Sequence, residues 1–200
     1  VMLGDDTGHS VWVNSVALEM MGVDSNTPDP VPGLSMFVRD ADGEPTGWIK
    51  EFAAWPHARP IAAAVDREVN KEGIATFLEY LSRLGVTTLL DAGNFDYHEL
   101  TYSLLAELEA AGRLPVRYEA SYHIILPDQV PGAINELLRL RRTYGSERLT
   151  FNTIKIHFDG TDEIRTGAVL EPFSDDPGNR GATLLGSSPM GDAAGGRGTL

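Results

Sequence analysis

The stretch LTFNTIKIHFDG, residues 149–160, decides how the rest of the chain is interpreted. It predicts one β-strand followed by a sharp exit, and the side chains of a strand alternate between two faces. Ile154, Ile156 and Phe158 fall on one face, while Thr153, Lys155, His157 and Asp159 fall on the other. A lysine is rarely buried without a partner or a function, and the C-terminal strand ends of a parallel barrel hold its active site. Two interpretations stay open here: a barrel strand ending in an active site, or a half-exposed antiparallel strand with a solvated polar face.

The composition is that of an ordinary globular chain with a strong negative charge. The 200 residues are 42% hydrophobic and 22% charged, which predicts one domain or slightly more, and the formal net charge is -13. This charge opposes binding to nucleic acid or to an anionic membrane, so we expect a small-molecule partner. The absence of cysteine excludes disulfides, thiolate catalysis and cysteine-ligated zinc. No apolar run approaches the ~20 residues of a membrane span, and we expect a cytoplasmic location.

The first sixty residues predict a small inserted subdomain made of a helix and a hairpin. Residues 5–22 predict a helix capped by Asp6 or Thr7 and ended by Gly22, with His9 in its first turns. Proline-rich residues 24–33 form a connection, and the Asp-Gly turn at residues 40–43 predicts a hairpin. Glu51 lies near the end of this hairpin, and the sequence assigns it no role.

Helices and strands alternate from residue 66 onward. Apolar residues at helical spacing predict helices over 66–84, 97–111 and 130–144, and the runs between and after them predict strands over 86–90, 115–125 and 149–160. Strands separated by single helices imply right-handed crossovers and a parallel sheet. The predicted fold class is therefore α/β.

The strand at 115–125 favours a barrel over an open sheet. Val116, Tyr118, Ala120 and Tyr122 share one face, and Arg117, Glu119, Ser121 and His123 share the other. An open doubly wound sheet needs two apolar faces, whereas a barrel strand turns one face to the lumen, where polar groups can collect. We therefore predict a partial TIM (β/α) barrel over residues 61–181; an edge strand with ion pairs is the alternative for this segment.

The C-terminal region predicts a binding loop and then a tail. The acidic residues of 159–176 suit a loop over the strand ends, and the Gly/Ser-rich residues 182–200 predict a flexible tail. A second interpretation of the whole chain is a small α/β binding module whose acidic loop holds Ca²⁺ or another ligand. A barrel enzyme that uses Lys155 as a Schiff-base amine is a third possibility.

Several segments, taken in order, resemble the YtcJ-like amidohydrolases of the amidohydrolase 3 family. They are Gly8–Ser15 with Ala17-Leu18, Thr27–Pro30, Asp42–Gly47, Gly85–Thr88 with Asp91–Gly93, Ile154–Gly160, Arg165–Ala168 and Glu171–Phe173. No single motif is decisive, but their order over residues 1 to about 181 makes the resemblance fairly specific.

The resemblance implies a TIM barrel with divalent metals at its C-terminal face and hydrolysis of a carbon–nitrogen bond in an amide or formamide. Lys155 matches the family's lysine on the fourth barrel strand, which in related enzymes is carboxylated and bridges two metals. We therefore predict Lys155 as a metal ligand, one or two zinc ions as the cofactor, and an amide-type small molecule as the substrate. We predict His9, His157, Asp159 and Arg165 as substrate-binding residues, and a homodimer is compatible with the family.

The chain also departs from the pattern that the resemblance implies. It has five histidines but no His-x-His pair, and single histidines and an aspartate are expected on strands that the resemblance places after residue 181. The matching segments correspond to barrel strands two to four and the insertion before them. We therefore expect an internal fragment that is inactive by itself, because Lys155 alone does not hold a binuclear site.

Overall fold

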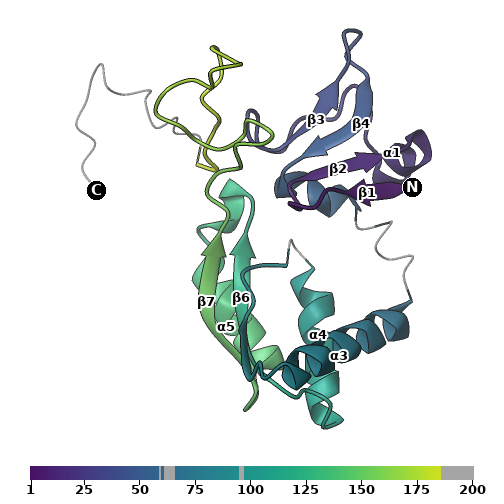
Figure 1. Cartoon of the computed structure of the whole chain (residues 1–200), viewed down its shortest axis with the longest axis vertical. Coiled ribbons are helices and arrows are strands. Elements are labelled where there is room, and N and C mark those ends of the chain that lie inside the picture. The colour runs from purple at the N-terminus through teal and green to yellow at the C-terminus, as the bar shows by residue number, and fades with distance from the viewer. Residues whose placement is uncertain (59, 61–65, 95–96, 186–200) are drawn as a thin grey trace. The chain divides into compact units, whose positions relative to one another are not determined.

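The structure of this protein is a computed structural model that describes residues 1–58, 60, 66–94 and 97–185 (Figure 1). Its contacts group into two compact units. The first unit combines Val1–Pro60 with the residues from His157 onward, and the second unit is Ile61–Ile156. The predicted domain ranges are 1–60, 61–181 and 182–200, and their boundaries differ from those of the two units. The domain ranges stay a prediction. Each unit is described by itself below.

A four-stranded antiparallel sheet forms the centre of the first unit. The strand order is β1-β2-β4-β3, with bounds Met2–Gly4, Ser10–Val13, Pro45–Lys50 and Met36–Arg39. The hairpin of β3 and β4 confirms the prediction from the Asp-Gly turn, where Gly43 has a φ of 86° that suits a glycine. Val11, Phe37 and Ile49 are buried on this sheet and supply much of its core.

The predicted helix over residues 5–22 is wrong in its first half. Residues 10–13 form strand β2, and helix α1 covers only Ser15–Met21. The run Val11-Trp12-Val13 has strong strand preference, and pairing with β1 on one side and β4 on the other overrides the helical spacing. Asn14 caps α1 by accepting a hydrogen bond from the Ala17 N–H at 3.1 Å, and Gly22 ends it as predicted.

The segment after β4 and the segment from residue 157 complete the first unit. A 3-10 helix, η1, covers Phe52–Ala58, and residues 157–185 contain isolated bridges such as Asp159 with Thr183. Within the predicted tail, Thr183 and Leu184 are buried, and the Leu184 N–H donates to the Phe158 carbonyl at 2.6 Å. Residues 186–200 of that tail lie outside the described residues.

The second unit confirms the predicted alternation of helices and strands. Its parallel sheet has the order β5-β6-β7, with bounds Thr88–Leu90, Arg117–Ile124 and Leu149–Ile156. The helices are α3, α4 and α5, with bounds Arg67–Arg83, His98–Ala110 and Ala133–Tyr144, and a short 3-10 helix η2 covers Pro127–Gln129. Helix α5 packs on β6 and β7 (Figure 1). The antiparallel interpretation of residues 149–160 is therefore wrong, and closure of this sheet into a barrel stays a proposal.

Strand β6 is buried on both of its faces over its second half. Ser121 and His123 of the predicted polar face are buried, as are Ala120 and Tyr122. The pairing with β7 shifts by one residue between Ala120 and Ser121, which is a β-bulge. The Tyr102 hydroxyl of α4 accepts a hydrogen bond from the Ser121 N–H at 3.1 Å, so α4 covers this irregular point of the strand.

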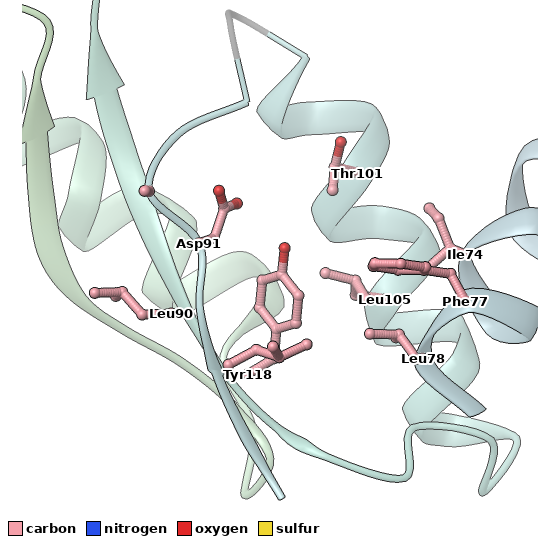
Figure 2. A pocket seen from close by; sticks show the side chains of 10 residues that line it. Ile74, Phe77, Leu78, Leu90, Asp91, Thr101, Leu105 and Tyr118 are labelled. Carbon is pink, nitrogen blue, oxygen red and sulfur yellow. The ribbon is translucent and has the colours of Figure 1, made fainter. Parts of the chain in front are cut away.

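An apolar pocket of about 330 Å³, open to solvent, lies on the second unit between α3, α4 and the edge strand β5. Figure 2 shows Phe77 and Leu78 of α3 facing Tyr118 and Asp91 across it. Burial, and then the negative charge of Asp91, raise the pKa of the Tyr118 hydroxyl above its ordinary value. Phe77 and Leu90 are more than half exposed, so this face of the unit presents apolar surface. Among the described helices none has the length and apolar composition that crossing a membrane requires.

Candidate functional site

Two imidazoles converge on one buried carboxylate in the first unit. The His9 Nδ1 atom lies 2.8 Å from Glu51 Oε2, and the His157 Nε2 atom lies 3.2 Å from the same oxygen. The side chain of Glu51 is 1% exposed, and those of His9 and His157 are 20% and 13% exposed. We call these three residues, His9, Glu51 and His157, the His–Glu–His cluster.

The antiparallel pairing of β2 and β4 brings His9 and Glu51 together. His9 directly precedes β2 and Glu51 directly follows β4, and Ser10 pairs with Lys50 in register. The Glu51 N–H donates to the His9 carbonyl at 2.9 Å, which extends this pairing by one residue. His157 is the first residue of the second chain segment of this unit. The cluster therefore joins residues that are up to 148 positions apart in the sequence.

Glu51 adopts a backbone conformation that is unusual for its residue type. Its φ is 58°, in the left-handed region that non-glycine residues seldom occupy. Such residues cost roughly 1–3 kcal/mol and are concentrated at functional sites. The conformation turns the chain from β4 into η1 and directs the Glu51 carboxylate into the interior, toward the two histidines.

Thr166 and Gly160 complete the surroundings of the Glu51 carboxylate. The Thr166 hydroxyl donates to Glu51 Oε1 at 2.5 Å and accepts from the Thr161 N–H at 3.1 Å. Gly160 passes so close that a Cβ atom there would lie 2.4 Å from Glu51 Oε1 and 2.0 Å from Thr166 Oγ1. A glycine at this position therefore allows the loop to close over the carboxylate.

Hydrogen bonding holds Glu51 in its charged form. Burial raises the pKa of its carboxyl, but hydrogen bonds from His157, Thr166 and His9 together outweigh burial and leave that pKa below its ordinary value. The groups that contact this carboxylate are two imidazoles and a hydroxyl, none of which carries a permanent positive charge. The cluster is thus a buried carboxylate with two imidazole nitrogens in contact with it.

The Phe52 ring fixes the orientation of both imidazoles. Its centroid lies 4.7 Å from that of His9 and 4.5 Å from that of His157, the second contact being edge-to-face. The two imidazole centroids are 5.6 Å apart. An apolar wall on one side leaves the ring nitrogens directed at Glu51 and lowers the polarity around them.

The structure separates the four residues that the sequence predicts for substrate binding. It brings His9 and His157 into the cluster, whereas Asp159 and Arg165 hold the loop that follows. Asp159 accepts from the Ala168 N–H at 3.1 Å, and the Arg165 Nε donates to Asp175 at 3.0 Å. Whether any of the four binds substrate stays a prediction.

Lys155 lies in the second unit, near the C-terminal end of β7. It pairs in register with His123 of β6, so the two side chains leave the same face of adjacent parallel strands. A Cβ atom on Gly93, which follows β5, would lie 2.4 Å from His123 Nδ1. The ends of three parallel strands thus meet around His123 and Lys155, where a barrel places its active site.

A second group of possible metal ligands occurs in the second unit and has a different character. His98, Glu99 and Glu136 bring one ligand atom each within 4.8 Å of one another. Arg139 forms ion pairs with both Glu99 and Glu136, and its Nε atom lies 3.0 Å from each Glu136 oxygen. The guanidinium pairs with both carboxylates, so this group is an ion-pair network.

The acidic loop predicted as a Ca²⁺ or ligand site does not gather its carboxylates. Over the part of the chain that the structure describes, no three acidic groups of 159–176 bring ligand atoms within 4.8 Å of one another. Asp175 is paired with Arg165, and Asp159 is bonded to the backbone. The binding-module interpretation gains no support from this geometry.

Glu51 is the residue of the His–Glu–His cluster that sequence reasoning left without a role. Its position directly after a predicted hairpin strand gave no periodic signal, and its histidine partners are 42 and 106 residues away. The pairing of β2 with β4 was hidden by the wrong helix over residues 5–22. A predicted strand at residues 10–13 would have placed His9 beside Glu51.

Comparison with known proteins identifies the family. A family model described as "Amidohydrolase family" matches residues 1–194. The chain belongs to this amidohydrolase family. The resemblance stated from the residues is thereby confirmed, and hydrolase activity in general is the function of the class.

Three relatives show how much of a whole protein this chain represents. The Exoenzymes regulatory protein AepA of Pectobacterium carotovorum subsp. carotovorum is 34% identical over 174 residues, 86% of this chain and 37% of that protein. The putative amidohydrolase YtcJ of Bacillus subtilis (strain 168) is 28% identical, over 92% of the chain and 33% of that protein. Protein LONG AFTER FAR-RED 3 of Arabidopsis thaliana is 26% identical, over 89% of the chain and 30% of that protein. The chain therefore spans about a third of the length of these curated relatives, and no solved structure matches it.

Proposed function

We propose that this chain is part of a metal-dependent hydrolase that cleaves non-peptide carbon–nitrogen bonds in small amides or formamides. The observation that carries the proposal is the family match over residues 1–194. The parallel sheet of the second unit supports it, because Lys155 lies where parallel barrels hold their active-site groups. The proposed cofactor is a divalent metal, zinc by preference, and the whole protein is proposed to be cytoplasmic and compatible with a homodimer.

The ligand set that the family implies is incomplete within these 200 residues. Lys155 suits the proposed role, since a neutral amine adds CO₂ to give a carbamate with two hard oxygen ligands. The chain has no His-x-His pair to accompany it. We therefore assign no catalytic step through the binuclear centre, and we infer that these 200 residues by themselves do not turn over substrate.

The proposal is tested on the product of the complete reading frame that encodes these residues. Purified protein is assayed with Zn²⁺ against a panel of N-acyl amines and N-substituted formamides, and release of the amine is measured. Metal-dependent turnover is expected, and Lys155→Ala is expected to reduce kcat at least 100-fold. Added short carboxylic acids should restore part of that activity, because they replace the carbamate oxygens. Lys71→Ala, on α3, is the matched lysine-to-alanine control; Lys71 forms ion pairs with Glu68 and Glu107, and its removal should leave kcat unchanged.

Two results would contradict the proposal. One is a complete protein that hydrolyses no member of the panel with any divalent metal. The other is a Lys155→Ala protein with full activity. The 200-residue chain is assayed in parallel, and robust turnover by it would contradict the inference that it is inactive alone.

A further inference from the structure

The His–Glu–His cluster has the donor set of a transition-metal site. Two histidine nitrogens and one carboxylate oxygen form the protein ligands of several catalytic zinc centres, with bonds of about 2.0–2.2 Å. Those bond lengths place the ligand atoms of a tetrahedral site about 3.3 Å apart. The observed separations from Glu51 Oε2 are 2.8 Å to His9 and 3.2 Å to His157, and all three ligand atoms lie within 4.8 Å of one another. An ion between them would require the His9–Glu51 separation to widen by about 0.5 Å, while the His157–Glu51 separation already fits.

Charge also favours a cation at this place. Glu51 is a carboxylate with 1% exposure, and buried charges in proteins are paired or coordinate metals. The groups that contact it are imidazoles and a hydroxyl, in contrast to Glu136 in the second unit, whose carboxylate has the Arg139 guanidinium. The neighbouring Lys50 ammonium interacts electrostatically with Glu51 but donates its hydrogen bond to the Ile164 carbonyl. A divalent ion would supply a positive charge in direct contact with the carboxylate.

The atoms around the cluster match the outer shell of a metal centre. Ligating carboxylates are normally hydrogen-bonded at their other oxygen, and Thr166 donates to Glu51 Oε1 at 2.5 Å. The Phe52 ring contacts both imidazoles and provides an apolar wall. The φ of 58° at Glu51 marks a conformation that the surroundings impose; Arg165, in the loop that follows, has a similar φ of 60°. These three features are independent of the donor distances and point to the same site.

We propose that His9 Nδ1, His157 Nε2 and Glu51 Oε2 bind one divalent transition-metal ion, with Zn²⁺ preferred. The donor set selects zinc-like ions over Mg²⁺ and Ca²⁺, because imidazole is a poor ligand for those harder cations. The ion has three protein ligands, which leaves a coordination position for water or a substrate oxygen. All three ligands belong to the first unit and Lys155 is not among them, so this proposal does not depend on the carbon–nitrogen hydrolysis proposed above.

The test measures metal binding by the 200-residue chain without any substrate. Chelator-treated protein is titrated with ZnCl₂ in a calorimeter, and CoCl₂ binding is followed by visible absorption, which reports nitrogen and oxygen ligands directly. We expect one Zn²⁺ per chain and no comparable binding of Mg²⁺ or Ca²⁺. Glu51→Gln and His9→Ala should each weaken the Zn²⁺ affinity more than 100-fold and change the Co²⁺ spectrum.

Milder variants keep the test decisive if Glu51→Gln fails to fold. Thr166→Val removes the hydrogen bond to Oε1 and should weaken Zn²⁺ binding 10- to 100-fold, while Thr166→Ser should retain it. The control is His57→Ala, a histidine of the same unit that packs edge-on against Phe37 at a centroid distance of 5.3 Å. It should bind Zn²⁺ like the unsubstituted chain.

The proposal is overturned by a folded chain that binds no Zn²⁺ at stoichiometric concentration. It is equally overturned by Zn²⁺ binding that His9→Ala and Thr166→Val leave unchanged. Because no turnover is measured, failure here leaves the hydrolase proposal untouched. An inactive complete protein would in turn leave this site untouched.

Discussion

Gly160 shows how a single missing side chain allows the loop of residues 157–185 to close over Glu51. A Cβ atom at this position would lie 2.0 Å from Thr166 Oγ1 and 2.4 Å from Glu51 Oε1. Both contacts are far below van der Waals distance, and both partners are held by hydrogen bonds. Gly160→Ala is therefore expected to lower the free energy of unfolding by about 1–3 kcal/mol through overpacking. Urea denaturation followed by circular dichroism measures the change.

The matched control for this substitution is Gly178→Ala in the same loop, where a Cβ atom meets nothing within 4 Å. That variant should be within about 0.5 kcal/mol of the unsubstituted chain. Equal stability of Gly160→Ala and Gly178→Ala would show that the loop does not pack on Glu51 as described.

Tyr102 is the residue that secures the irregular point of β6. Its hydroxyl accepts from the Ser121 N–H at 3.1 Å and lies 3.0 Å from Asp91 Oδ2, and the residue is fully buried. Burial raises the pKa of this hydroxyl, which therefore stays protonated through the neutral range. Tyr102→Phe keeps the ring, including its 5.0 Å edge-on contact with Phe151, but leaves a buried backbone N–H without this acceptor.

We expect Tyr102→Phe to cost about 1–3 kcal/mol of unfolding free energy, the price of an unsatisfied buried donor. Tyr80→Phe on the exposed side of α3 is the comparison, with an expected change of less than about 0.5 kcal/mol. Thermal melts of both variants measure this difference. Indistinguishable melting temperatures would refute the role of the Tyr102 hydroxyl in stabilising β6.

At the scale of elements, Glu119 ties β6 to β7. Its carboxylate accepts from the Asn152 N–H at 2.7 Å, from Asn152 Nδ2 at 3.1 Å and from the Thr153 hydroxyl at 3.3 Å, and it also contacts the Thr150 hydroxyl. Burial raises the pKa of Glu119, but these hydrogen bonds outweigh it and leave the pKa below 4.5. A carboxyl whose pKa is lower in the folded state stabilises that state above its unfolded pKa.

The expected pH dependence of stability follows from the lowered pKa of Glu119 in the folded state. The contribution of Glu119 is complete at neutral pH and is lost as the pH falls from about 4.5 through the lower pKa of the folded state. Glu119→Gln should therefore cost about 1 kcal/mol at pH 7, allowing for solvent screening of a half-buried group, and progressively less as the pH falls below about 4.5. Urea titrations at several pH values measure this difference. Glu147→Gln, at an exposed position before β7, should show no such trend, and a Glu119→Gln penalty that is constant with pH would contradict the argument.

The elements that the sequence predicts well are those whose signals are local. Helices α3, α4 and α5 have apolar residues at helical spacing, and Gly85 and Gly145 follow the ends of α3 and α5 as predicted. Strand β5 follows as a short apolar run, and β6 and β7 follow as segments in which apolar and polar residues alternate. The alternation of strands with helices implies that the three strands are parallel. Strand β2 was missed because Val11, Leu18 and Met21 also fit a helical stripe. Its true conformation depends on pairing with β4, which lies more than thirty residues away.

The candidate site was predictable only in part, for the same reason. His9 was recognised as a candidate from its motif and His157 from its place on the same strand face as Lys155. Glu51 depends on strand pairing and on a left-handed backbone conformation. Neither feature leaves a periodic trace in the sequence. Asp159 and Arg165 were expected to act on a ligand, but charge in a loop does not reveal that a backbone N–H or Asp175 satisfies it.

At the scale of the whole molecule, the second unit exposes features that promote self-association. Among the described residues its sheet has three strands, so β5 and β7 each present an unpaired edge, and Leu90 and Ile156 are exposed on those strands. Open edges and apolar surface favour pairing with another chain. We expect sedimentation velocity to show concentration-dependent oligomers. Leu90→Lys should reduce them, and Leu170→Lys, at an exposed loop position, should not. A monodisperse monomer that melts cooperatively at every concentration would contradict this expectation.

The division into two units allows the proposed metal site to be tested by which unit Zn²⁺ stabilises. All three ligands lie in the first unit, so Zn²⁺ at 100 times its Kd should stabilise that unit by about 2.7 kcal/mol. Hydrogen exchange should then slow in β2, in β4 and the Glu51 N–H, and in residues 157–168, while amides of α4 and β6 exchange at unchanged rates. His9→Ala should abolish the effect, and His57→Ala should preserve it. Equal slowing in both units would mean that Zn²⁺ acts outside the cluster or that the two units unfold together. Unchanged exchange throughout would mean that the cluster is a hydrogen-bonded core of the first unit, with Glu51 satisfied by His9, His157 and Thr166 alone.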